Sequence, residues 1–221
     1  MRNKHRTLLL DLDGTLADTA PDLAHALNTV RQEEGFEPLP FETIRPSVSH
    51  GSVALIKIGF DPGIPESRAE ELRQRLLGHY ANRLCEETRL FEGMDELLDQ
   101  CEHAGIAWGV VTNKPAYLTN PLMQQLGLYE RAACIISGDT LEKRKPHPEP
   151  LLHACELAQG DPKSTIYVGD AERDIEAGNR AGMTTLVAMF GYLSEEDSPG
   201  NWMANGRVHH AEELIGWLAF S

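Results

Sequence analysis

The chain has 221 residues, of which 41% are hydrophobic and 24% charged, which is ordinary for a globular protein and enough for one domain with an insertion. Its formal net charge of −14 argues against nucleic acid and against an anionic membrane surface as partners. No segment is long and apolar enough for a membrane span, and no secretory signal precedes Asp11. The cysteines are too widely spaced for a zinc site. We therefore expect a cytoplasmic protein with free thiols, as a monomer or a homodimer.

The first predicted element is a short strand over residues 7–10, which leads directly into the sequence Asp-Leu-Asp-Gly-Thr at 11–15. Aspartate is a poor strand residue and is costly to bury, so a pair of aspartates here indicates a function. Positions two apart on a strand face the same way, so Asp11 and Asp13 are aimed at one point. This suits a nucleophile and a proton donor with a divalent cation beside them. The simpler alternative is a turn that merely ends the strand.

The next seventy or so residues contain no convincing strand between 15 and about 84. Apolar residues recur at helical spacing and predict helices over 18–34 and 66–83, with shorter ones over 41–45 and 52–58. A helical insertion placed directly after the first strand would lie over the end of that strand as a lid.

The second half of the chain alternates strands with helices. We predict strands over 106–111, 132–137, 164–168 and 184–188, and helices over 93–104, 117–126, 148–158, 174–181 and 211–219. The polar stretch 191–206 is expected to be a loop, and Pro121 predicts a kink or a late start for its helix. Strands that are apolar throughout and alternate with helices indicate an α/β fold, with a parallel sheet covered on both faces. Ligands of such sheets bind beyond the carboxyl ends of the strands.

Polar residues follow four of the predicted strands. They are Asp11 and Asp13, Thr112 and Asn113, Lys145 before Pro146, and Asp170 with Asp174 four residues later. Each has a simpler explanation alone, as a turn, a helix cap or a surface lysine, and Lys143 is a rival for the role of Lys145. Together they supply what phosphoryl transfer needs, namely a nucleophile, carboxylates for Mg²⁺ and groups that neutralise phosphoryl oxygens.

These four motifs, at 11–15, 111–113, 145–146 and 169–174, resemble in order the motifs of the haloacid dehalogenase-like superfamily, and the resemblance covers the whole chain. It implies a Rossmann-like, three-layer core with a parallel sheet, formed by residues 1–16 and 86–221. It also implies a helical cap of the C1 type over 17–85. The activity implied is that of an Mg²⁺-dependent phosphatase that works through an aspartyl-phosphate intermediate.

The resemblance also implies roles for single residues. Asp11 would be the nucleophile, and Asp13 would protonate the leaving oxygen and then activate water. Phosphate would be held by Thr112, by Lys145 and by the backbone of Asn113. The metal would be bound by Asp11, the backbone carbonyl of Asp13, Asp170 and Asp174.

The substrate class follows from Asp13 and from the cap. The dehalogenase and phosphonate-cleaving branches lack the second acid, so Asp13 favours phosphate ester hydrolysis, or phosphoryl transfer as in the sugar phosphomutases. The fragments 18–23, 144–150 and 169–174 resemble the phosphoglycolate phosphatase group, whose relatives include phosphatases for N-acetylmuramic acid 6-phosphate in bacterial cell-wall recycling.

The cap segment 47–52 should face the site and bring His50, Gly51 and Ser52 to a small phosphorylated metabolite. Its Val-Ser-His sequence resembles the cell-wall relatives more than the glycine-rich turn of many phosphoglycolate phosphatases. We expect a phosphoglycolate phosphatase-like enzyme, with an N-acetylmuramic acid 6-phosphate phosphatase or a sugar phosphomutase as alternatives. A non-catalytic phosphate-binding protein is the remaining alternative, and the acids at 11 and 13 argue against it.

Overall fold

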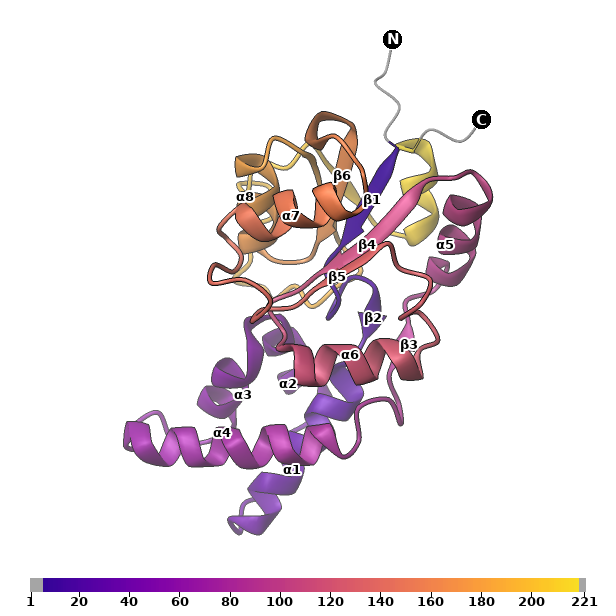
Figure 1. The fold of residues 1–221 in the computed structure, drawn as a ribbon. Coiled ribbons are helices and arrows are strands. Elements are labelled where there is room, and N and C mark those ends of the chain that lie inside the picture. The colour runs from indigo at the N-terminus through magenta and orange to yellow at the C-terminus, as the bar shows by residue number, and fades with distance from the viewer. Residues whose placement is uncertain (1–5, 219–221) are drawn as a thin grey trace.

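The computed structural model describes residues 6–218. Its main sheet has the strand order β5-β4-β1-β6-β7-β8, and every neighbouring pair is parallel, as Figure 1 shows for the strands labelled there. The strands are β1 Thr7–Leu10, β4 Ala107–Val111, β5 Cys134–Ile136, β6 Thr165–Gly169, β7 Thr184–Ala188 and β8 Gly206–Val208. The predicted α/β class with a parallel sheet is confirmed.

Helices cover both faces of the sheet, because the central strands bury side chains on both sides. On β1, Leu8 and Leu10 join the apolar cluster of one face, whereas Leu9 joins the cluster of the other. The first cluster takes side chains from α5 Met94–His103, α6 Ala116–Gln125 and the 3₁₀ helix η3 Ala211–Gly216. The second takes them from α7 Glu149–Leu157 and α8 Glu172–Arg180. The result is the expected three-layer core.

A separate group of helices lies beyond the carboxyl ends of the strands, below the sheet in Figure 1. We call them the cap helices: α1 Ala20–Glu33, α2 Phe41–Ile44, the 3₁₀ helix η1 Arg45–His50, α3 Gly51–Gly59 and α4 Glu66–Ala81. They bury an apolar cluster of their own. The chain enters and leaves them through an antiparallel pair, β2 Ala17–Asp18 and β3 Arg89–Leu90. The boundaries of 17 and 85 for a cap domain stay a prediction.

Short elements account for most differences from the sequence-based prediction. β2 lies in the stretch expected to hold no strand, and β8 begins at the end of the expected loop 191–206. Both are two or three residues long and take their partners from distant segments, so no periodicity in the sequence marks them. The predicted closing helix 211–219 was wrong in type, since it is a 3₁₀ helix that ends at Gly216. Residue 219 lies outside the described residues.

Most helix ends differ from the prediction by one or two residues, and two of the helices are informative. α6 runs through Pro121 without interruption and begins at Ala116, one residue before the expected start. α8 begins at Glu172 rather than at Asp174. The carboxylate of Asp174 accepts a hydrogen bond from the backbone N–H of Ala171 at 3.1 Å, so Asp174 caps the helix from its first turn instead of starting it.

The order of the strands determines where a ligand binds. From β1 the chain proceeds to β4 and β5 on one side and then crosses to β6, β7 and β8 on the other. In open parallel sheets, the point where the order reverses is where the crevice for ligands lies. β1 lies between β4 and β6, so the residues that follow these three strands meet at that point. Within residues 6–218, no helix combines the length and the apolar character needed to cross a bilayer.

Candidate active site

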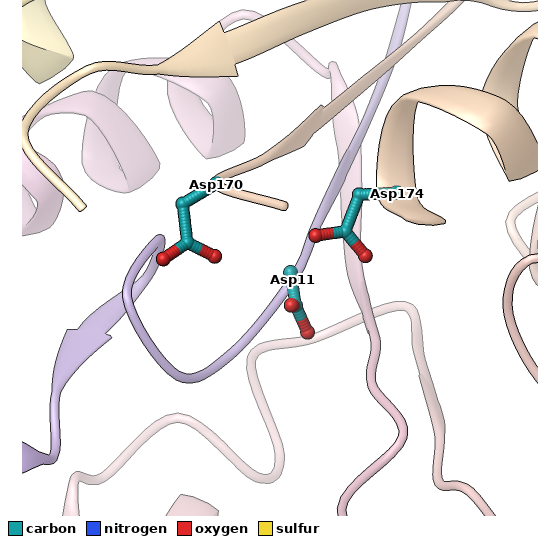
Figure 2. A group of neighbouring side chains, drawn as sticks. All are labelled: Asp11, Asp170 and Asp174. Atoms are coloured by element: carbon teal, nitrogen blue, oxygen red, sulfur yellow. The ribbon is translucent and has the colours of Figure 1, made fainter. Parts of the chain in front are cut away.

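Three buried carboxylates converge at the carboxyl ends of β1 and β6. Asp11 follows β1, Asp170 follows β6, and Asp174 lies in the first turn of α8. One oxygen from each lies within 4.8 Å of the others, and Figure 2 shows the side chain of Asp11 between those of Asp170 and Asp174. The sequence predicted all three as metal ligands, and the fold brings them together.

Burial dominates the electrostatics of this acidic cluster. It raises the pKa of Asp11 to about 6, although the ammonium of Lys145 opposes the shift. Burial, with the charges of Asp11 and Asp174 beside it, raises the pKa of Asp170 to about 7. Burial also disfavours the charge of Asp174, but Lys145 and Arg173 outweigh it and lower its pKa. Carboxylates held this close repel one another when ionised, and either protons or a cation relieve that repulsion.

The oxygen atoms of the cluster themselves indicate a site for a hard divalent cation. Asp170 Oδ1 is buried and has no hydrogen-bond partner among residues 6–218, which is costly unless something binds it. Its other oxygen, Oδ2, accepts hydrogen bonds from the Ser49 hydroxyl and from the backbone N–H of Tyr192. Gly14 leaves room for this carboxylate, because a Cβ at Gly14 would lie 2.1 Å from Asp170 Oδ2. Carboxylate oxygens of this kind are the ligands that Mg²⁺ takes.

Lys145 is buried against the same cluster, as its motif predicted. Its Nζ lies 2.9 Å from Asp11 Oδ1 and 2.8 Å from Asp174 Oδ1. It also donates to the carbonyl of Val111 at 2.9 Å and to the hydroxyl of Tyr167 at 2.8 Å. Lys143 is exposed, so it is not the lysine of the site.

Asn113 holds Lys145 in place through its side chain. Its Nδ2 donates to the carbonyl of Lys145 at 2.9 Å, and its Oδ1 accepts from the N–H of Lys145 at 3.0 Å. These two bonds join the loop after β4 to the loop after β5. Sequence reasoning considered only the backbone of Asn113 and did not predict this bracket.

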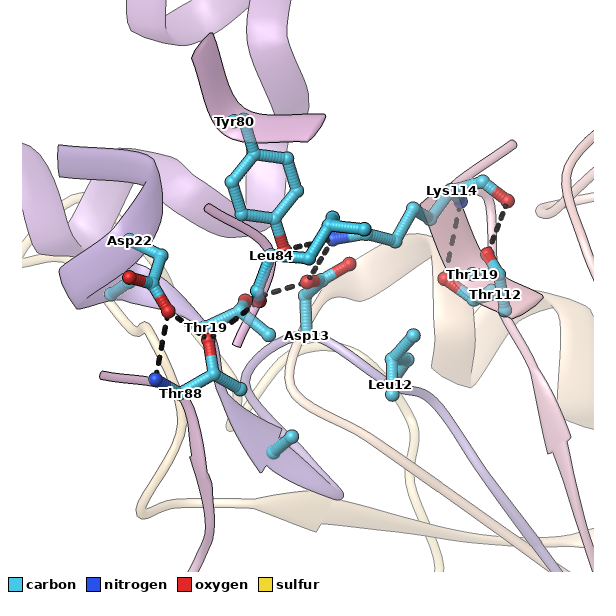
Figure 3. A network of polar contacts seen from close by, with 12 residues as sticks. Leu12, Asp13, Thr19, Asp22, Tyr80, Leu84, Thr88, Thr112, Lys114 and Thr119 are labelled. Carbon is cyan, nitrogen blue, oxygen red and sulfur yellow. Dashed lines mark hydrogen bonds and ion pairs between the residues drawn. The ribbon is translucent and has the colours of Figure 1, made fainter. Parts of the chain in front are cut away.

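Asp13 is held by two polar neighbours, Thr19 and Lys114, and Lys114 is bound in turn by Tyr80 of the cap helices (Figure 3). Its Oδ1 accepts from the hydroxyl of Thr19 at 2.6 Å and lies 2.8 Å from Nζ of Lys114. The same Nζ donates to the hydroxyl of Tyr80 in α4 at 2.8 Å. The sequence predicted neither Lys114 nor Tyr80 as a site residue. Lys114 directly follows the Thr-Asn motif, which is the only local signal that could have pointed to it.

A cleft of about 650 Å³ lies between the cap helices and the ends of the strands. Asp11 and Asp13 both line it, which confirms that the two acids face one space. The predicted substrate-binding residues line it as well: His50, Gly51, Ser52, Thr112, Asn113 and Lys145. Arg73, Lys114, Arg144 and Arg173 add positive charge to its walls, which suits an anionic ligand.

The 3₁₀ helix η1 touches the acidic cluster directly. Ser49 donates its hydroxyl to Asp170, and its carbonyl accepts a hydrogen bond from Nη2 of Arg173 at 2.6 Å. The segment 47–52 was expected to face the site, but the sequence gave no reason to choose Ser49 or Arg173. Their importance depends on how the cap helices lie against the core, which no local pattern encodes.

Comparison with known protein families identifies the class to which this fold and this site belong. The family model described as haloacid dehalogenase-like hydrolase matches residues 8–188, and the chain belongs to this family. It is a phosphatase of that family, a phosphoric monoester hydrolase, because its curated relatives at this level of identity are phosphatases.

Two relatives and one solved structure illustrate the match. An N-acetylmuramic acid 6-phosphate phosphatase from Pseudomonas aeruginosa is 39% identical over 217 residues, which are 98% of this chain and 96% of the relative. A phosphoglycolate phosphatase from Xanthomonas campestris pv. campestris is 40% identical over 209 residues, 95% of this chain and 94% of the relative. A crystal structure of a predicted phosphoglycolate phosphatase from Haemophilus somnus shares the fold with a TM-score of 0.84, at 23% identity, covering 96% of this chain and 97% of that one.

Proposed function

We propose that the protein hydrolyses a small phosphorylated metabolite through an aspartyl-phosphate formed on Asp11. One observation carries the proposal: Asp11 and Asp13 line the same cleft, and each has one carboxylate oxygen engaged while the other is available. Asp11 Oδ1 accepts from the N–H of Leu12 at 2.7 Å and lies beside Lys145, and the contacts of Asp13 use Oδ1 as well. Within the described chain, Oδ2 of each is the oxygen left to react.

The remaining residues support this reaction by holding charge and moving a proton. As Asp11 Oδ2 attacks phosphorus, the ester bond breaks and Asp13 gives its proton to the departing oxygen. Asp13, now a carboxylate, then takes a proton from the water that hydrolyses the aspartyl-phosphate. Lys145 and Thr112 line the cleft, and the positive charge of Lys145 and the hydroxyl of Thr112 would stabilise the other phosphoryl oxygens.

We propose Mg²⁺ as the cofactor, held by Asp11, Asp170 and Asp174 with the backbone carbonyl of Asp13. The orphaned oxygen of Asp170 and the all-oxygen donor set support this choice. When bound, the ion would neutralise the carboxylates and the phosphoryl oxygens as a Lewis acid. The family as a whole favours the same choice.

Two substrates are proposed, and the relatives support each about equally. One is 2-phosphoglycolate, as for the relative from Xanthomonas campestris, and the other is N-acetylmuramic acid 6-phosphate, as for the relative from Pseudomonas aeruginosa. The cleft favours the second, because about 650 Å³ is the size that holds a drug-sized ligand, and a two-carbon acid would fill little of it. We propose a cytoplasmic location as well, which free thiols at Cys85, Cys101, Cys134 and Cys155 support.

The test is phosphate release from a panel, with Mg²⁺ and with EDTA. The panel contains 2-phosphoglycolate, N-acetylmuramic acid 6-phosphate, hexose phosphates and p-nitrophenyl phosphate. We expect metal-dependent release, a single preferred natural substrate, and no turnover by Asp11→Asn. Isomerised hexose phosphate without phosphate release would show a mutase instead. No turnover of any compound would indicate a phosphate-binding protein.

A further inference from the structure

We propose that Lys114 and Tyr80 position Asp13 for proton transfer, and that Tyr80 makes this positioning depend on closure of the cap. Lys114 fixes one oxygen of Asp13 so that the other faces the leaving group. This inference rests on the phosphatase activity proposed above and adds two positioning residues to it.

The contacts of Lys114 leave it little freedom to do anything else. Its side chain is 6% exposed, and its Nζ lies 2.8 Å from Asp13 Oδ1 and 2.8 Å from the hydroxyl oxygen of Tyr80. Thr119 anchors the start of this segment by donating to the carbonyl of Lys114 at 3.1 Å. Because Thr19 donates to the same oxygen of Asp13, the carboxylate cannot rotate without losing both bonds. Oδ2 is thereby held in one direction, which is what a group that must meet a leaving oxygen requires.

The positive charge of Lys114 also favours proton donation by Asp13. When Asp13 gives its proton to the departing oxygen, it becomes a carboxylate beside an ammonium that is already in place. A charge that develops during the reaction is stabilised by a fixed partner in a partly dry site. Lys114 would therefore favour the transition state for proton donation as well as the geometry that leads to it.

Tyr80 connects this arrangement to the cap helices. It is fully buried near the end of α4, and burial raises its pKa well above the ordinary value, so its hydroxyl stays neutral. The Lys114–Tyr80 bond spans the cleft, from the loop after β4 to the cap helices (Figure 3). If the cap helices move away, Lys114 loses this partner and its hold on Asp13 loosens. Proton donation would then be efficient only over a closed cleft.

The alternative is that Lys114 simply contacts the substrate, since it also lines the cleft. The two roles differ in their dependence on the leaving group. A substrate contact strengthens the binding of every substrate and appears mainly in KM. Positioning of a proton donor matters for a poor leaving group and hardly at all for p-nitrophenolate, which departs without a proton.

The experiment compares p-nitrophenyl, phenyl and benzyl phosphate, which are similar in shape but differ in their leaving groups. The parameter is kcat/KM, because it reports the steps through formation of the aspartyl-phosphate and not its later hydrolysis. For Lys114→Met we expect kcat/KM to fall at least about tenfold more for benzyl phosphate than for p-nitrophenyl phosphate, within the 10²–10⁴ that a proton donor contributes. Lys114→Arg should recover part of this loss, and Tyr80→Phe should show a smaller loss with the same dependence.

Lys143→Met and Tyr129→Phe are matched controls, because Lys143 is exposed and Tyr129 lines a different pocket, together with residues of α6 and β5. Both should behave as the unmutated protein, and melting temperatures should show that all variants are folded. An equal loss on all three substrates in Lys114→Met, or a rise in KM alone, would overturn the proposal. An unchanged Tyr80→Phe would remove the link to the cap. If the unmutated protein released no phosphate at all, the proposed function would fail instead.

Discussion

Protons and a cation compete for the same three buried carboxylates, those of Asp11, Asp170 and Asp174. The pKa values of Asp170 and Asp11 are raised to about 7 and about 6, so the folded protein without a cation keeps protons that the unfolded chain releases near its ordinary carboxyl pKa. Stability of the cation-free protein should therefore fall as the pH rises from about 4, near the ordinary carboxyl pKa, to about 7, the raised pKa of Asp170. A cation that binds all three carboxylates removes this penalty.

We predict that Mg²⁺ raises the melting temperature more at about pH 8 than at about pH 5.5, because protons occupy Asp170 and Asp11 at the lower pH. The measurement is thermal unfolding with Mg²⁺ and with EDTA at both values. Asp170→Asn should lose most of the Mg²⁺ effect at both, since it removes one ligand. An equal shift at the two pH values would contradict the competition.

Position 14 requires a glycine because the carboxylate of Asp170 lies directly against its backbone. It has a φ of +82°, and a Cβ there would collide with the carboxylate of Asp170. We predict that Gly14→Ala lowers stability by more than the ~1–2 kcal/mol that this backbone conformation costs a residue with a side chain, and that it also weakens Mg²⁺ binding. Gly182→Ala is the control, because Gly182 has a φ of +74° with nothing within 4 Å. It should lose stability in urea but keep its activity; a loss of activity there would show that strain alone is responsible.

The residues that sequence reasoning found differ from those it missed in one physical respect. Asp11 and Asp170 each follow a strand directly, and Asp13 lies two residues after Asp11, so the ends of the strands and the direction of a parallel sheet are enough to place them. Lys114 and Tyr80 meet across the cleft from segments 34 positions apart, and the Thr-Asn motif before Lys114 is the one local pattern that marks either of them. Their contact depends on the angle at which the cap helices lie against the core.

The loops after β4 and β5 act as one unit because Asn113 joins them. Its two hydrogen bonds to the backbone of Lys145 fix the direction from which the lysine reaches Asp11 and Asp174. In the cap helices, Asn28 makes the same pair of bonds to the backbone of Leu39, at 3.0 Å and 2.8 Å. The chain thus offers the same bracket twice, once at the site and once away from it.

We predict that Asn113→Ala and Asn28→Ala lose similar amounts of stability, about 1–3 kcal/mol for two hydrogen bonds, in urea unfolding. Only Asn113→Ala should lower kcat, because only it releases the backbone of Lys145. Phosphate release under saturating substrate distinguishes the two. If Asn28→Ala lowered kcat as strongly, the effect would reflect general loosening and not the position of the lysine.

Elements of two or three residues were the least predictable part of the fold. β8 is added at the edge of the sheet by pairing with β7, and its sequence Gly-Arg-Val has no alternation long enough to indicate a strand. The long helices α1 and α4 were predicted nearly in full because their apolar residues repeat over several turns. The length of the repeat, rather than the importance of the element, determines what can be read from the sequence.

The whole molecule contains separate apolar cores for the sheet and for the cap helices. Among the described residues, the buried members of the cap cluster that lie outside the cap helices are Phe60, which directly follows α3, and Leu84, Leu118 and Tyr192. Polar links also cross from the cap helices to the core. They include the bonds of Ser49 and Lys114 described above, that of Arg45 to the carbonyl of Gly191 at 3.2 Å, and that of the backbone N–H of Ala20 to the hydroxyl of Tyr192 at 3.0 Å. Because so little apolar surface joins the two parts, the cap helices should be able to open while the sheet stays folded.

This arrangement predicts that the same substitution, Leu→Ala, has different effects in the cap helices and in the sheet. Leu76 in the cap cluster and Leu9 in the sheet are both fully buried, so Leu→Ala at either should cost about 2–5 kcal/mol locally. In hydrogen exchange, Leu76→Ala should reduce the protection of α1, α3 and α4 and leave β1, β4 and β6 unchanged. Leu9→Ala should reduce protection throughout, because loss of the sheet removes the surface against which the cap helices lie. An equal loss of protection in both parts with Leu76→Ala would mean that the protein unfolds as one unit and that the cap cannot open on its own.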